Sequence, residues 1–111
     1  MPAKRDIRIY LQDIFEAADL IEKYVEDISE DDFLKNFEKQ DAVLHRIQII
    51  GEAAKHVSED YRKKWNHIPW KEIAGMRDII VHEYFGVTME MIWKVAVEDI
   101  PKLKRQIEDL L

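Results

Sequence analysis

Apolar residues recur along this chain in steps of four and three, and this spacing limits the folds that the chain can adopt. The first such stripe consists of Ile7, Leu11, Ile14, Ala18, Ile21, Val25 and Ile28. Because an α-helix has about 3.6 residues per turn, these positions fall on one face, as in a helix that packs in a bundle. No segment shows the alternation that is typical of a half-buried β-strand. The sequence therefore predicts an all-α helical bundle, and its length predicts a single domain over residues 1–111.

Two further stripes predict a central helix and a long C-terminal helix. The central stripe consists of Val43, Ile47, Ile50, Ala54 and Val57, and the C-terminal one runs from Met89 to Leu110. Gly51 lies inside the central stripe, where glycine weakens a helix, so we expect a neighbouring backbone to approach it closely. Pro101 removes one hydrogen-bond donor from the C-terminal helix and crowds the carbonyl of Val97, which predicts a kink rather than an end.

Shorter elements are predicted from residues that commonly begin or end helices. A fourth helix should run from about Trp70 to Tyr84, with Pro69 in its first turn and Gly86 as its terminator. Side chains that can cap helix N-termini precede three other predicted helices, at Ser29, Ser58 and Thr88. The predicted bundle thus has long N-terminal, central and C-terminal helices, together with the helix over residues 70–84.

Composition narrows the classes of function. The formal net charge is −6, from 23 acidic and 17 basic residues, which argues against sequence-blind coating of nucleic acid, so any RNA contact should be local. Basic runs are more often solvated helix faces than binding sites; those in this chain are Arg62-Lys63-Lys64 and Lys102 with Lys104-Arg105. The absence of cysteine excludes disulfides and thiolate metal sites. With no apolar signal core or membrane-length span, we expect a soluble cytoplasmic protein.

Residues 77–84, Arg-Asp-Ile-Ile-Val-His-Glu-Tyr, combine a permanent cation, an imidazole and a phenol. Arginine offers a planar fork to phosphate oxygens, and histidine exchanges a proton near neutral pH. On an ideal helix Arg77 and His82 lie about 140° apart, whereas Asp78 shares a face with His82 and can hold its ring. To grip one phosphate together, Arg77 and His82 need a distorted helix end, a long arginine reach, or a second copy of the helix facing the first.

The spacing R-x-x-x-x-H-x-Y, the run Arg-Ile-Gln-Ile-Ile-Gly-Glu-Ala-Ala at residues 46–54 and the lead-in Ile-Pro-Trp at 68–70 resemble the HEPN-domain ribonuclease toxins of the HepT type. The resemblance covers nearly the whole chain. It implies a HEPN-type bundle in which the motif helices of a homodimer form one composite site for cleaving RNA. Arg77 and His82 become the catalytic pair, and Asp78 becomes the supporting polar residue. Cleavage then needs no metal, because the ribose 2′-hydroxyl attacks the adjacent phosphate while His82 exchanges the proton and Arg77 stabilises the charge.

The resemblance also implies a regulatory partner, an MntA-type nucleotidyltransferase antitoxin in a type VII-like toxin–antitoxin pair. This partner uses ATP to transfer AMP to Tyr84, and the toxin itself needs no cofactor. On an ideal helix Tyr84 falls within about 20° of Arg77. A phosphate added there would repel and block the phosphate of RNA.

Other interpretations of these residues stay open at this point. The main alternative is a non-catalytic helical module that binds a nucleotide or docks onto a nucleotidyltransferase, with Arg77 as a phosphate anchor. A purely structural dimerisation bundle is a third. Glu52, beside Gly51, can contact either a neighbouring helix or a partner subunit.

Two groups of residues are more simply explained by structure than by function. His45 and His56 lie about 16 Å apart along a helix, which is too far for one zinc ion. The tryptophans are predicted to serve the core rather than to stack on bases; they are Trp65, Trp70 and Trp93.

Overall fold

The computed structural model describes residues 6–82 and 87–111, with the backbone alone described over 78–82. Over these residues all elements are helical, which confirms the predicted all-α bundle. In chain order they are α1 (Ile7–Val25), α2 (Glu30–Lys35), α3 (Phe37–Lys55), α4 (Glu59–Lys64), α5 (Trp70–His82), α6 (Met89–Lys94), the π-helix η1 (Val95–Asp99) and α7 (Ile100–Glu108). Within the described part of the chain, no helix is both long enough and apolar enough to cross a membrane.

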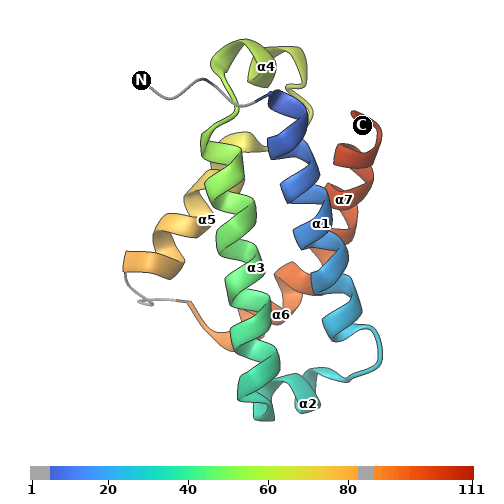
Figure 1. Ribbon diagram of the computed structural model, residues 1–111. Helices are drawn as coiled ribbons and strands as arrows, with labels where there is room; N and C mark the ends of the chain where they lie inside the picture. The colour runs from blue at the N-terminus through green and yellow to red at the C-terminus, as the bar shows by residue number, and fades with distance from the viewer. Residues whose placement is uncertain (1–5, 83–86) are drawn as a thin grey trace.

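The helices are arranged around the pair α1 and α3, which lie side by side (Figure 1). Helix α5 packs on α3, so that α3 lies between α1 and α5. Helix α7 packs on α1. The short helices α2 and α4 lie near opposite ends of α3.

One apolar core joins these helices, and it is built from the predicted stripes. The buried residues of α1 are Leu11, Ile14, Ala17, Ala18, Ile21 and Val25. Helix α1 ends at Val25, so the prediction that Ile28 continues its stripe within the helix was wrong. The backbone N–H of Ile28 donates to the carbonyl of Val25 in a turn, because Ser29 must leave the helix to cap α2.

The predicted caps are present, with one shift at α5. The hydroxyls of three residues each accept from a backbone N–H three positions later, at Ser29, Ser58 and Thr88. Helix α5 begins at Trp70, so Pro69 lies just before the first turn rather than in it, and its carbonyl accepts from the N–H of Ile73 at 3.0 Å. The predicted end of this helix, at Tyr84 and Gly86, lies outside the described residues.

The C-terminal helix is interrupted where the sequence predicted, one turn before Pro101. Over Val95–Asp99 it widens into a π-helix, in which the N–H of Ile100 donates to the carbonyl of Val95, five residues back rather than four. Proline cannot donate to the carbonyl four residues before it and crowds that carbonyl. A widened turn absorbs this mismatch, so the helix continues as α7 instead of ending.

Candidate active site

The predicted catalytic residues lie on α5, which is α-helical without a break from Arg77 to His82. The structure describes the side chain of Arg77, whereas the side chains of Asp78 and His82, and all of Tyr84, lie outside the described residues. The roles of those residues therefore stay predictions. The unbroken backbone shows that no distortion between Arg77 and His82 brings them to one face. Two of the three ways for Arg77 and His82 to grip one phosphate therefore remain, a long arginine reach and a second copy of the helix.

Helices α3 and α5 cross at Gly51, as the sequence predicted. A Cβ atom added at Gly51 would collide with the Cβ of Arg77 and would lie 3.2 Å from the backbone N of Arg77 and 3.2 Å from the carbonyl O of Ile73. Real Cβ atoms rarely come that close to another backbone, so the crossing requires glycine. The same contact places the base of the Arg77 side chain directly against α3.

Glu52, the next residue on α3, holds the other end of that arginine. Its Oε2 lies 3.1 Å from the Nε of Arg77. The side chains are 52% and 29% exposed respectively, so the ion pair lies at the edge of the crossing, within reach of solvent. Of the two contacts that the sequence left open for Glu52, the structure shows the one with a neighbouring helix. The sequence signal for it was an acid beside a glycine at a close helix crossing.

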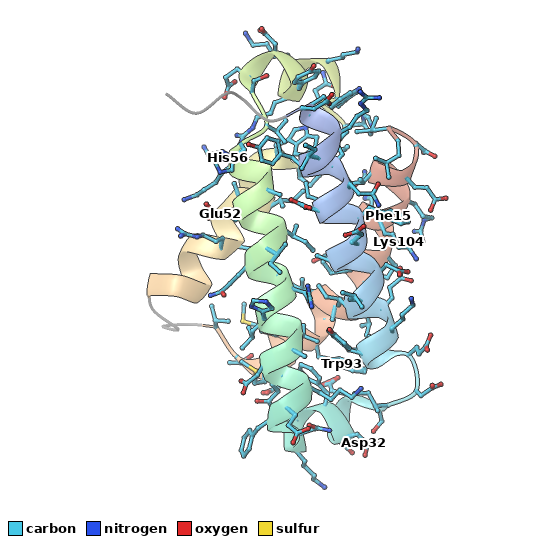
Figure 2. The ribbon with its side chains drawn as sticks, viewed as in Figure 1. Phe15, Asp32, Glu52, His56, Trp93 and Lys104 are labelled. Atoms are coloured by element: carbon cyan, nitrogen blue, oxygen red, sulfur yellow. The ribbon has the colours of Figure 1, made fainter. Side chains whose placement is uncertain are left out.

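The polar contacts continue from Glu52 across α3 to α1. The Nε2 of His56, one turn further along α3, lies 3.8 Å from Oε1 of Glu52. The His56 ring stacks on the ring of Tyr10, with centroids 5.1 Å apart and an angle of 11° between the planes. Figure 2 labels Glu52 and His56 at the end of α3 nearest α4. A line of contacts thus runs from Arg77 on α5 through Glu52 and His56 on α3 to Tyr10 on α1.

Comparison with known proteins places the chain in a family. The family model described as "Ribonuclease HepT-like" matches residues 14–110. The chain belongs to the HepT-like family. This confirms the resemblance seen in the sequence motifs.

The relatives of this HepT-like chain span most of its length. A protein of Thermococcus cleftensis named "Probable ribonuclease HepT" is 45% identical over 96% of this chain and 97% of its own. A Methanocaldococcus jannaschii protein named "Putative RNase" is 39% identical over 96% of this chain and 97% of its own.

A second M. jannaschii protein is larger. It is named "Gamma-glutamylcyclotransferase and putative RNase" and is 52% identical over 94% of this chain, which spans only 47% of that relative's length. No solved structure matches the HepT-like chain significantly.

One residue of each basic run in this HepT-like chain makes contacts that stabilise the bundle. The guanidinium of Arg62 donates to the carbonyls of Val57 and Ala54, at 3.1 Å and 2.9 Å, and so satisfies the C-terminal end of α3. Lys104 contacts Asp19 on α1 at 2.9 Å. The hydrogen bond from Lys104 holds the pKa of Asp19 below its usual value, and the same bond raises the pKa of Lys104. The other residues of the two runs are exposed, as predicted for solvated helix faces; they are Lys63, Lys64, Lys102 and Arg105.

The tryptophans also follow the structural interpretation. Trp70 is buried, and its indole N–H donates to the carbonyl of Trp65 at 3.0 Å. Trp65 is half-buried and stacks on Tyr61, and Trp93 is half-buried beside Phe33, with ring centroids 5.3 Å apart.

The described histidines and the groove between α5 and α7 do not add to the Arg77 site. Among the residues whose side chains are described, no group of three or more His, Cys, Asp or Glu could hold a metal ion. An open groove of about 430 Å³ lies between α5 and α7, and Arg77 does not line it. Its walls include His67, Glu72, Met76, Lys102, Leu103 and Gln106.

Proposed function

We propose that this chain is an endoribonuclease toxin whose active site is built around Arg77 and His82. The observation that carries the proposal is the placement of Arg77, which the crossing at Gly51 and the ion pair with Glu52 hold at the solvent-accessible edge of α3 and α5. Relatives named as ribonucleases match nearly the whole chain, which supports this class of activity. A partly exposed guanidinium in a fixed place suits the recognition of a phosphodiester.

The reaction that fits these side chains is internal transesterification of RNA. The ribose 2′-oxygen attacks the adjacent phosphorus, a P–O2′ bond forms and the P–O5′ bond breaks, leaving a 2′,3′-cyclic phosphate and a 5′-hydroxyl. The proton lost by the 2′-hydroxyl is matched by the proton gained at O5′, and an imidazole such as His82 can carry either transfer. Arg77 stabilises the negative charge that grows on the phosphorane oxygens. This chemistry needs neither a metal ion nor a cofactor.

A homodimer resolves the geometry of the motif. Arg77 and His82 lie about 140° apart on one unbroken helix, so a phosphate between two facing copies of α5 can reach both residue types more easily than a phosphate on one copy. Two copies also supply two imidazoles, one to accept the proton of the 2′-hydroxyl and one to donate a proton to O5′.

A nucleotidyltransferase antitoxin completes the proposed system, with both proteins acting in the cytoplasm. The phenol oxygen of Tyr84 attacks the α-phosphorus of ATP on the partner, diphosphate leaves, and AMP becomes attached to Tyr84. The added anion then repels an RNA phosphate near Arg77. Mass spectrometry after co-expression tests this step: an AMP-sized addition should map to the peptide with Tyr84 and disappear in Tyr84→Phe. Full silencing of Tyr84→Phe by an active partner would contradict it.

The decisive test of the ribonuclease proposal is incubation of the purified protein with RNA in the presence of a metal chelator. Arg77→Ala and His82→Ala should each lower the cleavage rate by about 100-fold or more, the usual range for a transition-state charge stabiliser or a proton-transfer group. Arg105→Ala removes another exposed arginine, on α7, and should leave the rate unchanged. RNA that stays intact with the wild-type protein would favour the alternative of a non-catalytic nucleotide-binding or nucleotidyltransferase-docking module.

A further inference from the structure

Arg77 is held by α3 at both ends of its side chain. At its base, Gly51 leaves so little room that the Arg77 Cβ lies against the α3 backbone. At its head, the Glu52 carboxylate lies 3.1 Å from Nε. A free arginine side chain samples many rotamers, and ordering it in one rotamer costs conformational entropy. Because Gly51 and Glu52 of α3 already restrain the Arg77 side chain, less of that cost remains when the guanidinium binds a phosphate.

We propose that Glu52 is a positioning residue for Arg77 during RNA cleavage, an inference that rests on the ribonuclease function proposed above. The guanidinium is planar, so a carboxylate fixed at Nε limits rotation of the whole group about the end of the side chain. The edge of the guanidinium that meets the phosphate is then set before the substrate arrives. Such preorganisation lowers the barrier because the group need not reorganise as charge develops.

The ion pair is poorly suited to a purely stabilising role. The Glu52 side chain is 52% exposed, and an exposed ion pair typically contributes little to the free energy of unfolding. Helix α5 is already held by the close approach at Gly51 and by the burial of its side chains Trp70 and Ile73 in the core. Removal of the Glu52 carboxylate should therefore leave the fold intact, so that a loss of activity can be assigned to Arg77.

The neighbouring His56 side chain lies beside the same carboxylate. His56 lies 3.8 Å from Glu52 and is itself packed on Tyr10 of α1. Ring stacking limits the movement of His56, and His56 in turn limits the directions open to the Glu52 side chain. His56→Ala should therefore weaken cleavage in the same direction as loss of Glu52, by a smaller factor, because the bond from Glu52 to Arg77 survives.

The test is steady-state cleavage of RNA by the full-length protein and its Glu52 variants, with kcat and KM measured separately. Glu52→Ala should lower kcat by a factor on the order of 10 to 100, the range expected when a catalytic group is displaced by about 1 Å. KM and the thermal unfolding midpoint should change little. Glu52→Gln keeps an acceptor oxygen for Nε and should recover part of the lost kcat. Glu38→Gln, the same charge change at an exposed position of α3, is the matched control.

A double-mutant cycle shows whether Glu52 acts through Arg77. Lysine at position 77 keeps a cation but has no planar Nε edge for the carboxylate to hold. In the Arg77→Lys background, Glu52→Ala should therefore change the residual rate by no more than about twofold, the scatter of independent effects. The full 10- to 100-fold loss in that background would overturn the inference.

The possible outcomes separate this inference from the function on which it rests. Cleavage that depends on Arg77 but is unchanged in Glu52→Ala and Glu52→Gln would overturn the inference and leave the ribonuclease function standing. A rise in kcat in either variant would also overturn it, because Glu52 would then restrain Arg77 rather than position it. A wild-type protein that cleaves no RNA would overturn both.

Discussion

Helix α3 contributes to two regions of this molecule that differ in how they are held together. In the core that α1, α3 and α7 build, large apolar side chains fill the space, and Ile14, Ile21 and Ile107 have no exposed surface. At the crossing with α5, the contact is closed by a residue without a side chain, Gly51. Polar groups can reach the edge of such a narrow crossing, as the pair of Glu52 and Arg77 does. The core therefore contributes most of the free energy of unfolding, and the crossing holds a polar pair at an edge that solvent can reach.

The largest change in stability is expected in the core. Ile14→Ala should lower the free energy of unfolding by about 2–5 kcal/mol, because it removes buried methyl groups and leaves a cavity. Ile9→Ala, on the same helix at a position that is 40% exposed, should cost much less. Urea unfolding of both variants measures the difference. The folded fraction of Ile14→Ala should cleave RNA at the wild-type rate, and equal losses of stability in the two variants would contradict the division into regions.

A smaller change of stability is expected at the crossing, where two glycines give a matched comparison. Gly51→Ala should destabilise the protein by about 1–3 kcal/mol through overpacking, although alanine is the better helix former. A Cβ at Gly75 meets nothing within 4 Å. Gly75→Ala should therefore stabilise the protein by about 0.5–1 kcal/mol. Thermal unfolding of the two variants decides the matter, and a stabilising Gly51→Ala would show that the crossing is not tight.

The smallest effect concerns the surface pair that links α7 to α1. The pKa of Asp19 lies below its usual value of 3.8, mainly because Lys104 donates a hydrogen bond to it. A second hydrogen bond, from Lys23, lowers this pKa further. A lowered pKa in the folded state stabilises the protein above the unfolded pKa, and this contribution is lost as the pH falls through the folded pKa. Since both side chains are partly exposed, the contribution at neutral pH should stay below about 1 kcal/mol.

Lys104→Met removes this contribution together with the contact of Lys104 with Glu22, at 3.4 Å. The variant should be less stable than the wild type at about pH 6, and the difference should shrink at about pH 3 as Asp19 becomes protonated. Urea unfolding at the two pH values measures it. A stability difference that is the same at both pH values would mean that Lys104 acts through its aliphatic stem or through the Phe15 ring, whose centroid lies 5.6 Å from its Nζ, and not through the two carboxylates.

The sequence predicted the regular parts of this fold well, for a physical reason. Steps of four and three in the apolar stripe around Ile14 follow directly from the helical repeat, and a hydroxyl that caps a helix, such as Thr88, is a local signal. Gly51 predicted a close crossing because glycine has no other advantage inside a helix. The stripes and caps depend on neighbours in the chain, so they can be read without a structure, whereas Gly51 predicted that a helix crosses closely but not which helix.

The parts that could not be predicted depend on contacts between distant segments. The partner of Glu52 could not be identified, because the pairing requires the register of α3 against α5. Similarly, the stacking of Tyr10 on His56 requires α1 to meet the end of α3.

The most direct test of the central claim, that Arg77 at this crossing serves metal-free cleavage of RNA, uses one short RNA and its 2′-deoxy counterparts. In the presence of chelator, the wild-type protein should cut the RNA and leave a 2′,3′-cyclic phosphate. A single 2′-deoxyribose at the cut position should abolish that cut. The Arg77→Ala variant should cut neither the RNA nor its 2′-deoxy counterparts. Cleavage at the deoxy position, or cleavage that is lost with the metal ions, would contradict the mechanism, because neither result is compatible with attack by the 2′-hydroxyl assisted by side chains alone.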